Sequence, residues 1–315
     1  MNASTNNQTN NRKKIYSLII YLLLFVAIAI FIYKYKNDFL NLKFDNCNYV
    51  LLLPLATLMI LLQISNGLLN NFWYRILGVT LTTKEWFGLS VINGLGNYLL
   101  PLRGGSLSNA IYLKKQHNFT YTNFLNIFAA TNLIVFWANS IFGLLSVLLI
   151  YLFYNQFSWL VFVIFFNMFI AFTIIFCGPD LSNFSVENKF TRALKGWSEI
   201  KKHRLAIMQT LLMATINTLL ISLMTFLEFR LLGVQASLQQ AFFLSIFSSF
   251  AQLLSITPGN LGIREGFMLY AGTVIGIPAV EIVAISAIDR VLMFLLTLPL
   301  GFYFVRFLLS KLRNN

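Results

Sequence analysis

The sequence predicts an all-α polytopic membrane protein, and three observations support this prediction. The chain has 315 residues, of which 58% are hydrophobic and only 10% are charged, a balance that a globular domain with one core does not have. Its apolar stretches reach about 20 residues, the length that a helix needs to cross a bilayer. Its basic residues gather where those stretches end, so orientation in the membrane explains the net charge of +13 better than nucleic-acid binding does.

Six apolar stretches are long enough to be full membrane spans. We expect them near residues 15–33, 49–73, 123–151, 157–176, 205–229 and 279–305. The run from Ile15 is too long for a signal peptide and lacks a small-residue cleavage site, so we interpret it as an uncleaved first span. Residues 1–14 are polar and predict a disordered tail, and residues 310–315 form a basic C-terminal tail.

Two further apolar regions are interrupted by proline and glycine. The first is broken at Pro101-Leu-Arg-Gly-Gly105, and the second at Pro258-Gly-Asn-Leu-Gly-Ile-Arg-Glu-Gly266. Each half is about half a membrane thickness long, because a full span needs about 20 residues. We therefore predict two re-entrant hairpins built from half-helices near residues 86–100, 106–113, 239–256 and 261–275. The alternative for the second break is a loop that rises just clear of the bilayer.

The distribution of basic residues predicts the orientation of the chain. With six crossings, sixteen of the 23 Lys and Arg residues fall on the side of the termini and four on the other side. The remaining three, Arg103, Arg264 and Arg290, fall at membrane depth. This asymmetry predicts cytoplasmic N- and C-termini. Residues 178–204 alternate apolar and charged side chains at helical spacing, which indicates an amphipathic helix in the membrane interface or docked on the protein.

The chain contains an internal repeat. Arg75-Ile-Leu-Gly-Val79 matches Arg230-Leu-Leu-Gly-Val234, and each segment follows a full span and precedes a broken pair of half-helices. Three crossings separate the repeat units, about 49–151 and 205–305, so the units are expected to point in opposite directions. Inverted repeats with interrupted helices are typical of transporters, and matching breaks are the best sequence indication of the substrate site. The two hairpins should therefore meet in one cavity.

The charged residues near the breaks suit an anionic ligand. Three arginines and two carboxylates fall there, with a net charge of +1: Arg103, Arg264, Arg290, Glu265 and Asp289. Guanidinium groups bind phosphate through paired N–H donors, and the N-termini of half-helices offer further donors. Glycines at the breaks would let a lipid head group approach the backbone: Gly104, Gly105, Gly259 and Gly262. The helix-breaking residues are Pro101 and Pro258.

Two alternatives for these side chains remain open. The charges can pair with one another and only hold the hairpins together, with Glu265 bound to Arg103 or to Arg290 and Asp289 in a further pair. The uncharged candidates can bind a head group or simply satisfy the backbone, the second role being favoured: Asn93, Asn97, Gln252 and Asn260. The two histidines, His117 and His203, lie away from the breaks, and no metal cluster or nucleophile–base motif is found. We expect no enzyme activity, no metal and no cofactor.

Three sequence features resemble a known family. Pro101 to Gly105, Thr257-Pro-Gly-Asn-Leu-Gly-Ile-Arg-Glu265, and Arg290 in the last span are similar to recurring features of the flippase-like transmembrane domain of lysylphosphatidylglycerol synthases. The resemblance covers nearly all of residues 15–309. It implies movement of an anionic phospholipid or lipid-linked head group between leaflets, in the cytoplasmic membrane of a bacterium or archaeon. The bifunctional members add an aminoacyl-transferase domain, and because this chain ends at Asn315 we expect no aminoacylation by it.

Three hypotheses follow for the function. The first is a lipid translocase that acts on a membrane phospholipid or a polyprenyl-linked lipid. The second is a non-transporting subunit that binds a lipid-linked glycan and supports a glycosyltransferase. The third is an integral membrane lipid-modifying enzyme that uses Glu265 or Asp289 as acid or base. A glycosyltransferase or a lipid synthase is the protein partner that these hypotheses imply, and no nucleic acid is expected.

Overall fold

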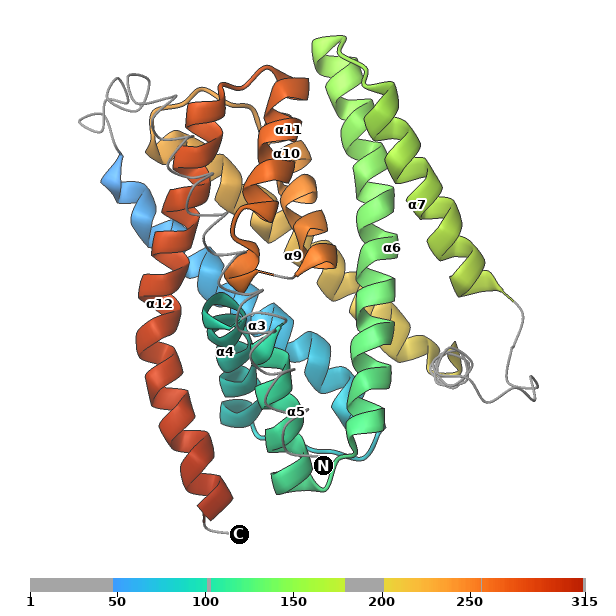
Figure 1. Cartoon of the computed structure of the whole chain (residues 1–315), viewed down its shortest axis with the longest axis vertical. Helices are drawn as coiled ribbons and strands as arrows, with labels where there is room; N and C mark the ends of the chain where they lie inside the picture. The colour runs from blue at the N-terminus through green and yellow to red at the C-terminus, as the bar shows by residue number, and fades with distance from the viewer. Residues whose placement is uncertain (1–47, 101–102, 179–200, 256, 314–315) are drawn as a thin grey trace, which may run out of the picture. The chain divides into compact units, whose positions relative to one another are not determined.

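The structure, a computed structural model, describes residues 48–100, 103–178, 201–255 and 257–313 (Figure 1). These ranges contain helices and no strand, which confirms the all-α prediction. The predicted tail 1–14, the predicted span 15–33 and nearly all of the amphipathic linker 178–204 lie outside the described residues.

Among the described residues, five helices are long and apolar enough to cross a membrane. They cover the second to sixth predicted spans, and the first of them follows a 3-10 turn at Tyr49–Leu51. The five are α3 (Leu52–Ile76), α6 (Tyr121–Tyr154), α7 (Trp159–Cys177), α9 (Arg204–Leu231) and α12 (Ala279–Arg313).

The shorter helices flank the two breaks that the sequence predicts. In the first half of the chain these are α4 (Thr83–Leu99) and α5 (Gly104–His117). In the second half they are α10 (Leu238–Phe250), the 3-10 segments η4 (Ala251–Leu254) and η5 (Pro258–Asn260), and α11 (Ile263–Ile275). Each is too short to span a bilayer alone.

Helices α3 and α9 pack against each other and run antiparallel. At one end the N–H of Asn48 donates to the carbonyl of Leu231 at 3.1 Å. At the other end Trp73 Nε1 donates to Thr210 Oγ1 at 2.9 Å. Polar contacts between otherwise apolar helices fix their register, because apolar surface alone gives little preference within a membrane.

The same local geometry ends both of these helices. The N–H of Val79 donates to the carbonyl of Tyr74 at 2.9 Å, and the N–H of Val234 donates to that of Phe229 at 2.9 Å. The glycine before each valine has a positive φ, 83° after α3 and 72° after α9. This is the Schellman ending, in which glycine takes the left-handed position at least cost. The repeated Arg-x-Leu-Gly-Val segment is therefore a repeated helix stop.

The helices that follow begin alike. The N–H of Thr82 donates to Glu85 Oε2 at 2.9 Å to start α4, and the N–H of Ser237 donates to Gln240 Oε1 at 2.9 Å to start α10. Both are capping boxes. Helix α4 covers residues 83–99, and α10 with η4 covers residues 238–254, so both boundaries differ by 155 residues.

Candidate functional site

The first break, residues 100–103, brings α4 and α5 into close contact. Arg103 caps α5 in the left-handed conformation, with φ of 56°. A Cβ atom added to Gly105 would lie 2.1 Å from the backbone oxygen of Asn93, and one added to Gly96 would lie 2.5 Å from the Cα of Gly105. Backbone atoms of the other helix fill the space where a side chain would lie, so only glycine allows α4 and α5 to approach this closely. Pro101 lies outside the described residues.

The side chain of Arg103 is held by neutral groups. Its Nη1 donates to Asn132 Oδ1 on α6 at 3.0 Å, and its Nη2 donates to the carbonyl of Gln252 in η4. The guanidinium carbon lies 5.0 Å from the centre of the Phe128 ring. Arg103 forms no ion pair with any carboxylate in the described part of the chain. Its positive charge is therefore available to an anion.

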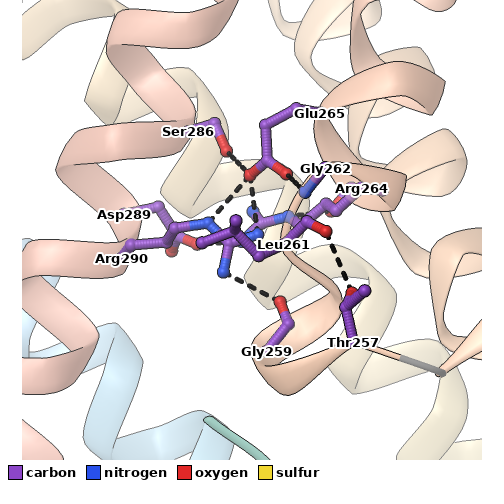
Figure 2. A network of polar contacts seen from close by, with 10 residues as sticks. Thr257, Gly259, Leu261, Gly262, Arg264, Glu265, Ser286, Asp289 and Arg290 are labelled. Carbon is purple, nitrogen blue, oxygen red and sulfur yellow. Dashed lines mark hydrogen bonds and ion pairs between the residues drawn. The ribbon is translucent and has the colours of Figure 1, made fainter. Parts of the chain in front are cut away.

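The second break contains a turn at residues 257–262 that is built by positive-φ residues. Gly259, Asn260 and Gly262 have φ of 56°, 54° and 83°. Thr257 Oγ1 donates to the carbonyl of Leu261 at 2.9 Å, and the N–H of Gly262 donates to Glu265 Oε2 at 2.8 Å (Figure 2). Glu265 thus caps the first turn of α11, where a carboxylate is favoured by the exposed N–H groups and the helix dipole.

Glu265 also binds α12. Its Oε1 accepts from Arg290 Nε at 2.8 Å and from Ser286 Oγ at 2.7 Å, and Arg290 Nη2 lies 2.6 Å from the same oxygen. Arg290 Nη1 donates to the carbonyl of Gly259 at 2.8 Å (Figure 2). Of the two partners that the sequence left open for Glu265, the structure places Arg290 beside it and not Arg103.

The third arginine, Arg264, joins three helices. Its Nε donates to Ser248 Oγ on α10 at 2.7 Å, and its Nη1 forms an ion pair with Asp289 Oδ2 on α12. Because the pair is largely buried, loss of either partner would leave an uncompensated charge in a poorly hydrated environment. Arg264 and Asp289 therefore fasten α10, α11 and α12 together.

A cavity of about 380 Å³ lies between the two breaks. Both breaks contribute to its wall, as the sequence predicts. Of the predicted site residues that the structure describes, four line it: Arg103, Gly259, Arg264 and Asp289. Five others form the surrounding framework and do not line it: Gly104, Gly105, Gly262, Glu265 and Arg290. Pro258 begins η5 beside the cavity.

The rest of the wall is rich in amide side chains. The four uncharged residues singled out in the sequence, Asn93, Asn97, Gln252 and Asn260, all line the cavity. Six further amides come from α3, α6 and α9, and one comes from α5 at the first break: Gln63, Asn66, Asn70, Asn132, Asn139, Asn217 and Asn109. Sequence reasoning did not assign these residues to the site, because most of them lie within apolar spans far in sequence from the breaks. Polar side chains inside spans were the available signal, since they face the protein interior rather than lipid.

One buried carboxylate was also missed. Glu228 lies near the end of α9, is 2% exposed, and lies within hydrogen-bonding reach of Asp289. It falls inside the predicted span 205–229, and an ionisable residue inside a span is by itself an indication of a functional site. Arg230, two residues further on, suggested a membrane edge and masked that indication.

A family model described as the lysylphosphatidylglycerol synthase TM region matches residues 15–301. The chain belongs to this family. The match confirms the resemblance to this family, and together with the five apolar helices it establishes an integral membrane protein. The family also indicates a function related to membrane lipids. No curated protein and no solved structure matches the chain significantly.

Proposed function

We propose that the protein binds the anionic head group of a membrane lipid in the cavity between the two breaks and moves it from one leaflet to the other. The observation that carries the proposal is the unpaired charge of Arg103. Arg264 is balanced by Asp289 and Arg290 by Glu265, whereas among the described residues Arg103 meets the neutral oxygens of Asn132 and Gln252 and no carboxylate. A phosphate at this point would supply the missing negative charge.

The amides of the cavity wall suit the rest of a polar head group. An amide side chain donates and accepts hydrogen bonds, so it can bind glycerol or sugar hydroxyls without adding charge. The wall also includes apolar side chains such as Leu62, Val135 and Met293. A cavity of this composition replaces the water that a head group loses when it leaves the membrane surface, which is the main barrier to lipid movement.

The arrangement of the helices supports alternating access to this cavity. We infer an inverted repeat with six spans and two re-entrant hairpins, α4–α5 and α10–α11. The antiparallel α3 and α9, their identical endings and the matched boundaries of the short helices support it. In transporters built this way the site lies at the repeat interface, and one unit moves against the other to expose it to each side in turn.

The proposed topology has its own test. In a variant without Cys47 and Cys177, single cysteines are placed at Asn2, Asn155 and Asn315. An impermeant thiol reagent added to intact cells should label position 155, in the turn between α6 and α7, and neither terminus. Labelling of a terminus would contradict the six-span topology with cytoplasmic ends.

A translocase explains the site better than a lipid-modifying enzyme. Glu265, one candidate acid or base, is bound by Arg290, by Ser286 and by the N–H of Gly262, so its oxygens serve structural contacts. A second candidate function is binding of a lipid-linked glycan in support of a glycosyltransferase. The number of amides in the wall favours it, because amides are common partners of sugar hydroxyls.

Lipid movement in vesicles tests the proposal. The full chain is reconstituted with a fluorescent phosphatidylglycerol in both leaflets, and a membrane-impermeant quencher reports transfer of the inner-leaflet lipid. Wild type should move phosphatidylglycerol, Arg103→Gln should lose most of this activity, and Arg103→Lys should keep part of it because lysine offers a point charge without the planar fork.

The matched control is Arg75→Gln. Arg75 is an exposed arginine at the end of α3, so its removal takes the same charge from the chain without touching the cavity. This variant should move lipid at the wild-type rate. The proposal would be contradicted by normal movement in Arg103→Gln, or by wild-type protein that binds a polyprenyl-linked glycan and moves no lipid, which would favour the second candidate.

A further inference from the structure

Glu228 has an unusual position for a carboxylate. Its side chain is buried in α9 with 2% of its surface exposed, and its Oε1 has no hydrogen-bond partner among the described residues. A buried carboxylate without a partner is costly, and in a membrane the cost is larger because no solvent screens the charge. The missing partner is a hydrogen-bond donor.

The group nearest to Glu228 is another acid. Asp289 on α12 lies within hydrogen-bonding reach of it, yet two ionised carboxylates have only acceptors to offer each other. Arg264 supplies one positive charge to this group and directs its Nη1 to Asp289. One arginine therefore faces two carboxyl groups. A single proton shared by the two acids would provide the hydrogen-bond donor that is missing between them and the second positive charge that balances them.

In the part of the chain that the structure describes, the other helices around Glu228 bring no second cation to it. Helix α4 brings Tyr98, helix α11 brings Arg264, and helix α12 brings Asp289 with Arg290 next to it, and Arg290 is already bound by Glu265. Helix α3 presents apolar side chains to this end of α9: Leu55, Met59 and Leu62. On α9 itself, Arg230 is exposed and lies over the ring of Phe226.

We propose that Glu228 and Asp289 form a proton-binding site, and that the protein takes up one proton at this pair when an anionic head group binds at Arg103. The inference rests on the proposed function and adds a second transported species, the proton. Uptake converts the Glu228 carboxylate to a carboxylic acid that donates to Asp289. No other bond is made or broken.

Charge balance explains why the two ligands should bind together. Near the cavity, three arginines (103, 264 and 290) face three carboxyl groups (228, 265 and 289). When all six groups are ionised, their net charge is zero, and a bound phosphate would leave one negative charge in a medium of low dielectric. When the Glu228–Asp289 pair holds one proton, the net charge of the six groups is +1, and a monoanionic head group restores neutrality. Asp289 lines the cavity whereas Glu228 lies behind it, so Asp289 provides the route for the proton.

The test measures binding of a short-chain phosphatidylglycerol to the purified full chain by calorimetry, in buffers with different ionisation enthalpies and from acidic to alkaline pH. Wild type should take up close to one proton per lipid bound. Its affinity should fall by up to about tenfold for each pH unit above the transition, because binding of proton and lipid is reciprocal. Infrared difference spectra should show a protonated carboxyl band in wild type.

Glu228→Gln should hold the protein in the form that binds phosphatidylglycerol tightly at every pH. The amide supplies the missing donor and is always uncharged, so affinity should stay near the low-pH value of wild type, no proton should be taken up, and the carboxyl band should be absent. Glu281→Gln, which removes a glutamate in the first turn of α12 outside the cavity, should keep the pH dependence of wild type.

The outcomes separate the inference from the function it rests on. Tight binding that requires Arg103 but shows no proton uptake in wild type would overturn the proton site and leave the lipid site standing. The same pH dependence in Glu228→Gln as in wild type would also overturn it. Absence of phosphatidylglycerol binding at every pH would overturn both. The proton count and the infrared band of wild type decide the matter even if Glu228→Gln fails to fold.

Discussion

The two breaks of this chain have similar helices but opposite electrostatics. At the first break Arg103 is held by an amide oxygen, a carbonyl and the face of a ring. At the second break Arg264 and Arg290 are each held by a carboxylate. The same residue type therefore fastens the fold in one half, and in the other half it has no carboxylate partner among the described residues. What decides its role is the neighbouring helix and not the motif that contains it.

The largest effect should come from breaking a pair at the second break. Asp289→Asn removes the ion-pair partner of Arg264, and removal of one partner of a buried pair typically costs about 3–5 kcal/mol in soluble proteins. We expect a strong fall in thermal stability and in membrane abundance. The double variant Arg264→Gln with Asp289→Asn should recover part of the loss, because the buried guanidinium is removed together with its partner and Glu228 can then be neutral.

Thermal unfolding of the purified variants checks this prediction. Arg103→Gln serves as the comparison, since it removes an arginine that has no ionic partner among the described residues and should cost much less stability. Equal destabilisation by Arg103→Gln and Asp289→Asn would mean that the two breaks do not differ as described.

The next effect should come from making the first break resemble the second. Asn132→Asp would give Arg103 an ionic partner at the present acceptor position, 3.0 Å from Arg103 Nη1. The new carboxylate should compete with the lipid phosphate, and loss of a hydrogen bond to a charged group costs about 1.5–3 kcal/mol, or roughly ten- to a hundredfold in affinity. Binding of short-chain phosphatidylglycerol measures it. Unchanged affinity in a folded Asn132→Asp protein would argue against Arg103 as the anion contact.

A smaller effect should come from the packing of the first break. Gly105→Ala places a Cβ atom 2.1 Å from the backbone of Asn93, and overpacking of this kind typically costs about 1–3 kcal/mol. The matched control is Gly266→Ala in the first turns of α11, where no atom lies within 4 Å of the added Cβ. Thermal unfolding should show a loss for the first variant and none for the second; equal behaviour would contradict the close approach of α4 and α5.

The smallest effect concerns the two capping boxes. Glu85 accepts from Thr82, from Tyr112 Oη at 2.7 Å, and from Lys311 Nζ at 3.2 Å. Burial opposes its ionisation, but these hydrogen bonds prevail and lower the pKa of Glu85 from 4.5 to about 2. Because the folded pKa lies below the ordinary value, the stability from Glu85 is complete above pH 4.5 and is lost as the pH falls toward 2.

Thermal unfolding at falling pH tests this effect. In Glu85→Gln, which copies the uncharged Gln240 of the second capping box, the loss of stability between pH 4.5 and 2 should be smaller than in wild type. The same acid sensitivity in both proteins would place the responsible carboxylate elsewhere.

Much of this architecture follows from local sequence. Apolar length predicts the long helices, and the Arg-x-Leu-Gly-Val segments predict two matching stops because glycine takes the left-handed position at a helix end. The partners of the charges do not follow from local sequence. Glu265 can reach Arg103 or Arg290 on sequence grounds, and only the packing of α11 against α12 decides for Arg290.

The candidate site was predictable in its location but not in its lining. The breaks indicate where the cavity lies, because broken backbone at membrane depth must be enclosed by protein. The amides on α3, α6 and α9 reach the cavity through tertiary packing over long sequence separations. An example is Asn217 Nδ2, which donates to Asn66 Oδ1 at 2.9 Å across 151 residues. The contact between Glu228 and Asp289 was hidden for the same reason, since the two residues lie on different helices.

Native mass spectrometry of the purified protein tests the central claim most directly, because it shows which lipid stays bound. Wild type and Arg75→Gln should retain an anionic phospholipid, and Arg103→Gln should lose it while staying folded. The account would be contradicted if Arg103→Gln kept the same anionic lipid in the same amount, or if wild type retained only lipids without a net charge.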